Sequence, residues 1–392
     1  MRQVLIMLAL ATAASGRLIP AQTQQFSTHL QEYGWQPAKL RMSNGEREIA
    51  ATRHLDFDSA GKLYVGFAVE GKNKLLKPGE ANNIFRVLTI DQESGEVKQT
   101  LDFATQSKER VGVNVSASDA LLITANDKVQ IVSKDGSSRM VFDIPVPAGN
   151  HILVIRESAS RKTLLLSIND LNTHYFLQSD TLSLITKCYT PPPPLPTRDH
   201  PGVNFSNKHE PGTFSDNIQI RLAHTTQLGP PYELVKGPLC GEAEDLWSLG
   251  TNVIEPILLD DSTVLELGTS KLDVNTSVFD VRKTNGELVW AEELPKHFLA
   301  DTLTLGPART ADGSRFAVEI VELRGGSQEF DISPKTVSMG VWIYDARTGK
   351  QVGSIKYPKL GPYEFALSPD GSRVAILSVD GGIVEVWKLP GS

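Results

Sequence analysis

Residues 311–317 read ADGSRFA, and residues 369–375 read PDGSRVA. Each phrase places an Asp-Gly pair, which favours a tight turn, directly before a run of residues of strand type. Short strands that recur at a fixed interval are the signature of a repeat architecture. The chain is therefore expected to consist of small β-sheets repeated along the sequence.

Similar turn signals precede apolar runs along most of the chain, beginning at Asp58, Ser116, Ser158 and Asp260. Most intervals suit a four-stranded propeller blade of about 40–50 residues. A wide interval follows Ser160 and has room for one degenerate blade, with candidate strands at 203–205 and 217–220. We predict an all-β fold, a β-propeller of seven four-stranded blades. Six or eight blades remain alternatives, because the middle blade is assigned from its interval alone.

The last blade lacks a fourth strand, because the chain ends soon after the apolar strand at 384–387. An N-terminal strand that completes this blade would remove two exposed sheet edges. Residues 38–42 (AKLRM) are the expected donor. The predicted organisation is a signal peptide at 1–16, an N-terminal extension at 17–35 and the propeller at 36–392.

The N-terminus has the layout of a secretory signal peptide. A basic start at Arg2 precedes an uncharged apolar run at 4–14 and small residues up to Gly16. A buried N-terminal element is the alternative. The first cysteine is Cys188, so no acylated cysteine follows the signal. We expect an exported, periplasmic or extracellular monomer without a membrane anchor.

The two cysteines, Cys188 and Cys240, form an even pair. In an oxidising compartment such a pair favours a disulfide bond, which would enclose the proline run at 191–194. Two separate buried thiols are the alternative.

The charge balance argues against a polyanionic ligand. The chain has 39 basic and 46 acidic residues, a net charge of −7, and no block of like charge. Nucleic acid binding requires a clustered basic surface, so it is not expected.

The phrase at 367–375 (LSPDGSRVA) resembles the repeat of the Tol-system periplasmic propellers and the propeller domains of prolyl-oligopeptidase-like proteins. The segments at 341–345 (VWIYD) and 384–388 (VEVWK) look like the third strand of WD-repeat blades. This resemblance covers two blades and fades elsewhere. It implies a bacterial exported β-propeller with WD40-like repeats, and it carries over no catalytic residue because fold does not imply function.

Motifs for catalysis or metal binding are weak. There is no Gly-x-Ser-x-Gly elbow, and the densest group of potential ligands is Asp199, His200, His209 and Glu210, whose spacing is not that of a zinc site. A Gly-x-x-x-Trp ending, at 286–290, faintly resembles quinoprotein dehydrogenase blades. We expect no catalytic residue, no cofactor and no metal.

Loop lengths suggest which face binds a partner. Turns between first and second strands are short, whereas longer insertions at 70–83, 190–202, 268–276 and 321–339 fall on the opposite face. Insertions on one face of a repeat array often mark its binding side, although tolerated insertions are the alternative. The candidate binding residues are Lys72, Lys74, Lys77, Arg324, Glu329, Phe330 and Asp331.

These observations favour a non-catalytic protein- or peptide-binding or scaffold module. The alternative is a propeller enzyme of lyase or glycosidase type, with its site at the mouth of the central channel. A sensor domain separated from its signalling partner is a third possibility. An enzyme should gather carboxylates, histidine or tyrosine from several blades, whereas a scaffold should show an apolar and aromatic patch.

Overall fold

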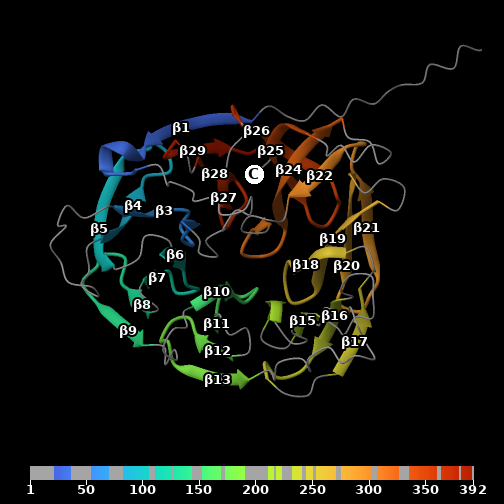
Figure 1. The fold of residues 1–392 in the computed structure, drawn as a ribbon, viewed down its shortest axis with the longest axis horizontal. Helices are drawn as coiled ribbons and strands as arrows, with labels where there is room; N and C mark the ends of the chain where they lie inside the picture. Colours follow the sequence, from blue (N-terminus) through green and yellow to red (C-terminus); the bar gives the residue numbers. More distant parts are fainter. Residues whose placement is uncertain are drawn as a thin grey trace, which may run out of the picture.

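A computed structural model describes residues 22–36, 54–69, 83–105, 111–125, 128–143, 152–168, 173–189, 211–215, 218–222, 232–240, 244–249, 253–270, 275–301, 307–325, 335–359, 363–378 and 381–390. These residues form small antiparallel sheets arranged in a ring, as Figure 1 shows. Six sheets have four strands and one has five. The all-β propeller predicted from the repeated turns is confirmed.

The first four sheets, called blades 1 to 4, follow one another along the chain. Blade 1 contains β2 (Leu55–Phe57), β3 (Leu63–Val69), β4 (Asn83–Ile90) and β5 (Val97–Thr105). Blade 2 contains β6 (Gly112–Val115), β7 (Leu121–Ala125), β8 (Lys128–Val132) and β9 (Arg139–Asp143). Blade 3 contains β10 (Ile152–Glu157), β11 (Thr163–Ile168), β12 (Thr173–Gln178) and β13 (Leu184–Tyr189). Blade 4 contains β14 (Pro211–Phe214), β15 (Ile218–Leu222), β16 (Tyr232–Lys236) and β17 (Glu244–Ser248).

The remaining three sheets complete the ring. Blade 5 contains β18 (Val253–Leu258), β19 (Thr263–Thr269), β20 (Ser277–Lys283) and β21 (Leu288–Glu293). Blade 6 contains β22 (Phe298–Asp301), β23 (Ala308–Arg309), β24 (Arg315–Arg324), β25 (Lys335–Asp345) and β26 (Gln351–Lys356). Blade 7 contains β27 (Tyr363–Leu367), β28 (Arg373–Ser378), β29 (Ile383–Lys388) and, from the N-terminus, β1 (Thr23–His29).

The closing strand is N-terminal, as predicted, but it is a different segment. Strand β1 pairs antiparallel with β29, from Thr23 opposite Lys388 to His29 opposite Ile383. It is followed by the short 3-10 helix η1 (Leu30–Tyr33), whose fully buried Leu30 packs between blades 7 and 1. That apolar anchor explains why the upstream strand is used. The propeller therefore begins before residue 36, and the expected donor at 38–42 lies outside the described residues.

The repeated phrase forms the turn that its sequence predicts. The Oγ1 atom of Thr310 accepts a hydrogen bond from the amide of Arg315 at 3.0 Å and donates one to Asp312 at 2.8 Å. Gly313 has φ +68°, a left-handed conformation that residues with a side chain rarely adopt. Ser368 makes the corresponding bonds in blade 7. The local chemistry of the turn thus fixes the start of the second strand in both blades.

The core consists of separate clusters, one at each junction between neighbouring blades, as expected when each repeat buries its faces against its neighbours. The junction of blades 6 and 7 has the largest cluster. The junction of blades 3 and 4 has the smallest among the described residues, with Leu165, Phe176 and Phe214 buried. The tryptophans of the two segments that resemble WD-repeat strands, Trp342 and Trp387, pack against such clusters.

Two details of the strand prediction are corrected by the structure. The insertion expected at 321–339 is narrower, because β24 continues to Arg324 and β25 begins at Lys335. Ten register pairs extend this hairpin from Arg315–Asp345 to Arg324–Lys335. In the degenerate blade, β15 (Ile218–Leu222) matches the strand expected at 217–220, whereas 203–205 lies outside the described residues.

Candidate functional site

Arg161 reaches from a turn of blade 3 to two other blades. Its Nη2 atom donates to Oδ1 of Asp56 at 2.9 Å, and its Nη1 atom donates to the carbonyl oxygens of Phe57 at 3.2 Å and Val115 at 3.4 Å. Asp56 is 1% exposed. Burial opposes the charge of Arg161, but the carboxylates of Asp56 and Glu157 overcome this effect and raise its pKa. Arg161 therefore ties blades 1, 2 and 3 together.

Arg309 on β23 makes a second set of contacts between blades. Its Nη1 atom donates to the carbonyl oxygen of Leu259 in blade 5 at 2.8 Å, and its Nη2 atom donates to that of Ser158 in blade 3 at 3.1 Å. Blades 3 and 6 are not neighbours in the ring (Figure 1). Arg161 and Arg309 thus span the centre on the short-turn face, the face that holds the turns between first and second strands.

A third polar contact on the short-turn face joins blades 1 and 2. The ammonium of Lys134 lies 2.8 Å from Oδ2 of Asp58 and 3.2 Å from Oδ2 of Asp119. Ser59 donates its amide to Asp119 at 2.7 Å. Burial opposes the charge of Lys134, but hydrogen bonds to both carboxylates raise its pKa. Burial, together with the charge of Asp58, likewise raises the pKa of Tyr64. These charges hold two blades together.

Blades 7 and 1 are joined near the opposite end of their inner strands. Glu364 on β27 is buried and accepts the amide hydrogens of His54 at 2.6 Å and Leu55 at 3.0 Å. The Nδ1 atom of His54 also lies 3.0 Å from this carboxylate. The Glu364 carboxylate thus satisfies the backbone donors at the start of β2, and the His54 ring packs against the same carboxylate, so both side chains have a structural role.

Glu266 on β19 is a buried carboxyl whose pKa is strongly perturbed. Burial raises its pKa to about 7, Arg282 opposes this effect at 3.6 Å, and Asp280 adds to it. Asp280 itself accepts from Arg282 at 3.1 Å. Val264, which shares the Glu266 face of the strand, packs into the cluster between blades 4 and 5. Glu266 therefore lies between two blades, on the strand next to the inner strand β18 and opposite Pro256.

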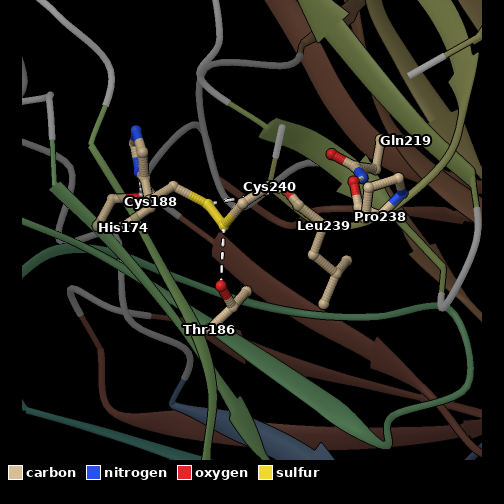
Figure 2. The surroundings of a disulfide bond; sticks show 8 residues. His174, Thr186, Cys188, Gln219, Pro238, Leu239 and Cys240 are labelled. Carbon is tan, nitrogen blue, oxygen red and sulfur yellow. Dashed lines mark hydrogen bonds between the residues drawn. A yellow bond between two sulfur atoms is a disulfide. The ribbon is translucent and has the colours of Figure 1, made fainter. Parts of the chain in front are cut away.

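The predicted disulfide bond between Cys188 and Cys240 is confirmed. The two Cα atoms are 5.6 Å apart. Cys188 is on β13 of blade 3, and Cys240 follows β16 of blade 4. Figure 2 shows the hydroxyl of Thr186 pointing toward the Sγ atom of Cys240, 3.4 Å away. The bond reinforces the junction that has the smallest described apolar cluster.

Exposed apolar side chains gather on the outer strands of blades 2 and 3. Met140 on β9 is 50% exposed, and Leu184 and Tyr189 on β13 are 53% and 65% exposed. Ile185 is exposed beside them. We call these four residues the blade 2–3 patch. Figure 1 shows β9 and β13 at the perimeter of adjoining sheets.

The strand register explains why the patch lies over one junction. Leu184 is opposite Leu177 and Tyr189 is opposite Thr173 in β12. Met140 is opposite Ile131 in β8. Residues directly opposite in an antiparallel pair point to the same face. Because Leu177 and Ile131 belong to the cluster between blades 2 and 3, Met140, Leu184 and Tyr189 extend that cluster to the perimeter.

The candidate loop residues are largely outside the described part of the chain. This holds for the three lysines and for the acidic and aromatic group, which are Lys72, Lys74, Lys77, Glu329, Phe330 and Asp331. Arg324 is described, and it is the last residue of β24 rather than a loop residue. Its Nη2 atom lies 2.8 Å from Glu322 Oε1, and its side chain is 73% exposed.

Sequence reasoning missed Arg161, Arg309 and the blade 2–3 patch. A partial signal exists for Arg161, which replaces the usual glycine or aspartate in its turn and adopts φ 58°. Arg309 contacts residues far away in the sequence, so its neighbours carry no signal. The patch could have been suspected from β13, in which the sequence LITKCY has a single charge.

Two kinds of feature are absent from the described residues, a metal-binding cluster and a membrane-spanning helix. Within these ranges, no group of three or more His, Cys, Asp or Glu side chains could hold a metal ion. No helix in the described part of the chain is long and apolar enough to span a bilayer.

No protein-family model and no curated protein sequence matches this chain. Similar solved structures include the β-propeller domain of Cps50 (Swd1) from Myceliophteria thermophila, with 12% identity, a TM-score of 0.49, and coverage of 88% of this chain and 97% of that one. Hydrazine synthase from Kuenenia stuttgartiensis has 12% identity and a TM-score of 0.49, with coverage of 91% and 100%. Likeness at this level carries no argument about function.

Proposed function

We propose that the chain is an exported, non-catalytic β-propeller that binds a protein or peptide. The blade 2–3 patch is the observation that carries this proposal. Exposed apolar side chains gathered on one part of a folded protein commonly mark an interaction site. Tyrosine and methionine, both present in the patch, are enriched at such sites.

The polar groups near the inner strands support a binding role over an enzyme of lyase or glycosidase type. Asp56 is engaged by Arg161, and Glu364 by the amides at the start of β2. A catalytic acid or base must be free to exchange a proton with a substrate. These carboxylates instead hold neighbouring blades together. Glu266, whose pKa is raised, lies between blades 4 and 5.

Export is part of the proposal. A disulfide bond forms and persists in oxidising compartments, so the Cys188–Cys240 bond supports a location outside the reducing cytosol. The apolar run at 4–14 supports it independently as an expected secretory signal.

Two surfaces are proposed for the partner. The long-loop face, with Arg324 at its rim, remains the surface that the loop lengths favour. The blade 2–3 patch is the surface that the described side chains favour. They lie on different parts of the propeller, so a site-specific probe can distinguish them.

Photo-cross-linking in the producing cells tests the proposal. A photoreactive phenylalanine derivative is placed at Tyr189 in the patch, at Arg324, or at Leu288 on the exposed outer strand of blade 5 as the matched control. We expect one protein to be cross-linked at position 189 or 324 and not at 288, and its yield at 189 to fall in a Leu184→Ser background. Equal cross-linking at all three positions, or none, would contradict a specific binding role.

A further inference from the structure

The outer edge of β13 carries little of the charge that protects edge strands from pairing. Its six residues, Leu184–Tyr189, carry one charge, on Lys187. The corresponding strand of blade 5 ends in Glu292 and Glu293. Charged side chains on an edge strand oppose pairing with another chain. The edge of β13 therefore opposes pairing with another chain less than the edge of blade 5 does.

This edge offers backbone groups as well as side chains. Within the described part of the chain, β13 is the last strand of its sheet and pairs with β12 alone. An edge strand presents a row of N–H and C=O groups that an extended segment can match. Thr186 and Cys188 are opposite Phe176 and His174, on the face toward blade 4. The disulfide therefore occupies one face of β13 and leaves the other to the patch.

Lys187 determines the charge that the occupant should carry. It is opposite Tyr175, so it lies on the same face as Leu184 and Tyr189. Its ammonium lies 5.1 Å from the centre of the Tyr175 ring. Among the described residues, this ammonium has no carboxylate partner. An acidic side chain next to apolar ones would complement this face.

We propose that an extended, acidic peptide segment of a partner pairs with the edge of β13 as a fifth strand of blade 3. Its apolar side chains, at alternate positions, cover the blade 2–3 patch, and a carboxylate reaches Lys187. This inference rests on the proposed binding function and names its surface and ligand class. A second copy of the chain fits less well, because pairing of two β13 edges would bring two Lys187 ammonium groups together and would supply no carboxylate for either.

Selection from a displayed library of random eight-residue peptides tests this proposal with the full chain as bait. We expect peptides enriched in alternating apolar residues and in one aspartate or glutamate. Selection on a Lys187→Glu variant should instead enrich lysine or arginine. In solution, a selected acidic peptide should bind the wild-type chain about five-fold more tightly than Lys187→Glu, the factor expected for an exposed ion pair of about 1 kcal/mol.

Three further measurements distinguish strand addition from nonspecific hydrophobic binding. Methylation of alternate backbone nitrogens in the selected peptide should abolish binding, because it removes the donors to the edge. Tyr189→Ser should weaken binding, and Val289→Thr on the exposed strand of blade 5 should not. The proposal would be overturned if methylated and unmethylated peptides bound equally well. It would also be overturned if sedimentation analysis showed a dimer that the Lys187→Glu substitution dissociates.

The outcomes also separate this inference from the proposed function. Selected peptides that bind the wild type, Lys187→Glu and Tyr189→Ser equally would place the binding site elsewhere, and the edge proposal would fail while the binding function stands. A library that yields no enriched peptide would contradict both.

Discussion

Replacement of Arg161 by methionine tests whether the central arginines hold the ring together. Methionine keeps much of the apolar stem and removes the guanidinium donors. Both residues have a side chain, so the left-handed backbone at this position, with φ 58°, is equally strained in each. The change therefore isolates the contacts with Asp56 and with the carbonyl oxygens of Phe57 and Val115.

The expected loss follows from the surroundings of Asp56. Removal of one partner of a buried ion pair costs about 3–5 kcal/mol. Asp56 would still accept hydrogen bonds from the amides of Val115 and Phe57, both at 2.8 Å. The side chain of Arg161 is also 21% exposed, so part of the cost is relieved by water. We expect Arg161→Met to lower the free energy of unfolding by about 2–3 kcal/mol.

Urea unfolding followed by tryptophan fluorescence measures this loss. Arg324→Met is the matched control, because its ion pair with Glu322 is exposed and should contribute little to stability. Asp56→Asn and the double variant complete a mutant cycle. A double variant that loses the sum of both single effects, or an Arg161→Met that is no less stable than the control, would refute the role assigned to this pair.

Three other predictions concern the disulfide, a buried carboxyl and the closing strand. Replacing Cys188 and Cys240 by serine should lower stability by about 4 kcal/mol, the chain-entropy value for their separation of 52 residues, and dithiothreitol should bring the wild type to the same urea midpoint. Burial raises the pKa of Glu266 from 4.5 to about 7, so the folded chain binds this proton more tightly than the unfolded chain, and the stabilisation is lost as pH rises through this range. Glu266→Gln should therefore match the wild type at pH 4.5 and exceed its stability by roughly 2–3 kcal/mol at pH 8 in urea unfolding; an unchanged difference at the two pH values would contradict this. Leu30→Ala should cost about 3 kcal/mol because Leu30 is fully buried behind β1, whereas Leu288→Ala on the exposed strand of blade 5 should leave the thermal midpoint almost unchanged.

The blades could be predicted because their turns are specified locally. Thr310 donates to Asp312 and accepts from Arg315 within six residues, so the sequence of one turn is sufficient to identify it. The same holds for Asp91, whose carboxylate accepts the amide of Ser94 at 2.9 Å in a turn between third and fourth strands. Repetition of such turns determines the architecture.

The segment that forms the closing strand and the central contacts could not be predicted in this way. Strand β1 has the polar sequence TQQFSTH, and it becomes a strand because β29 offers a free edge and Leu30 a buried anchor. Arg309 is bonded to the carbonyl oxygen of a residue 151 positions away. Neither feature has a local pattern, because both depend on which blades the closed ring brings together.

The two faces of β13 suggest how its edge is kept in place. Toward blade 4, Cys188 is bonded to Cys240 at the junction with the smallest described cluster. Toward blade 2, Leu184 and Tyr189 extend a larger cluster and remain exposed. A strand fixed on one face loses less conformational freedom when a partner binds to the other. Reduction of the disulfide should therefore weaken binding of a β13 peptide under conditions in which the propeller remains folded. Equal peptide affinity for the oxidised and reduced chains would show that the bond stabilises the fold without organising this edge.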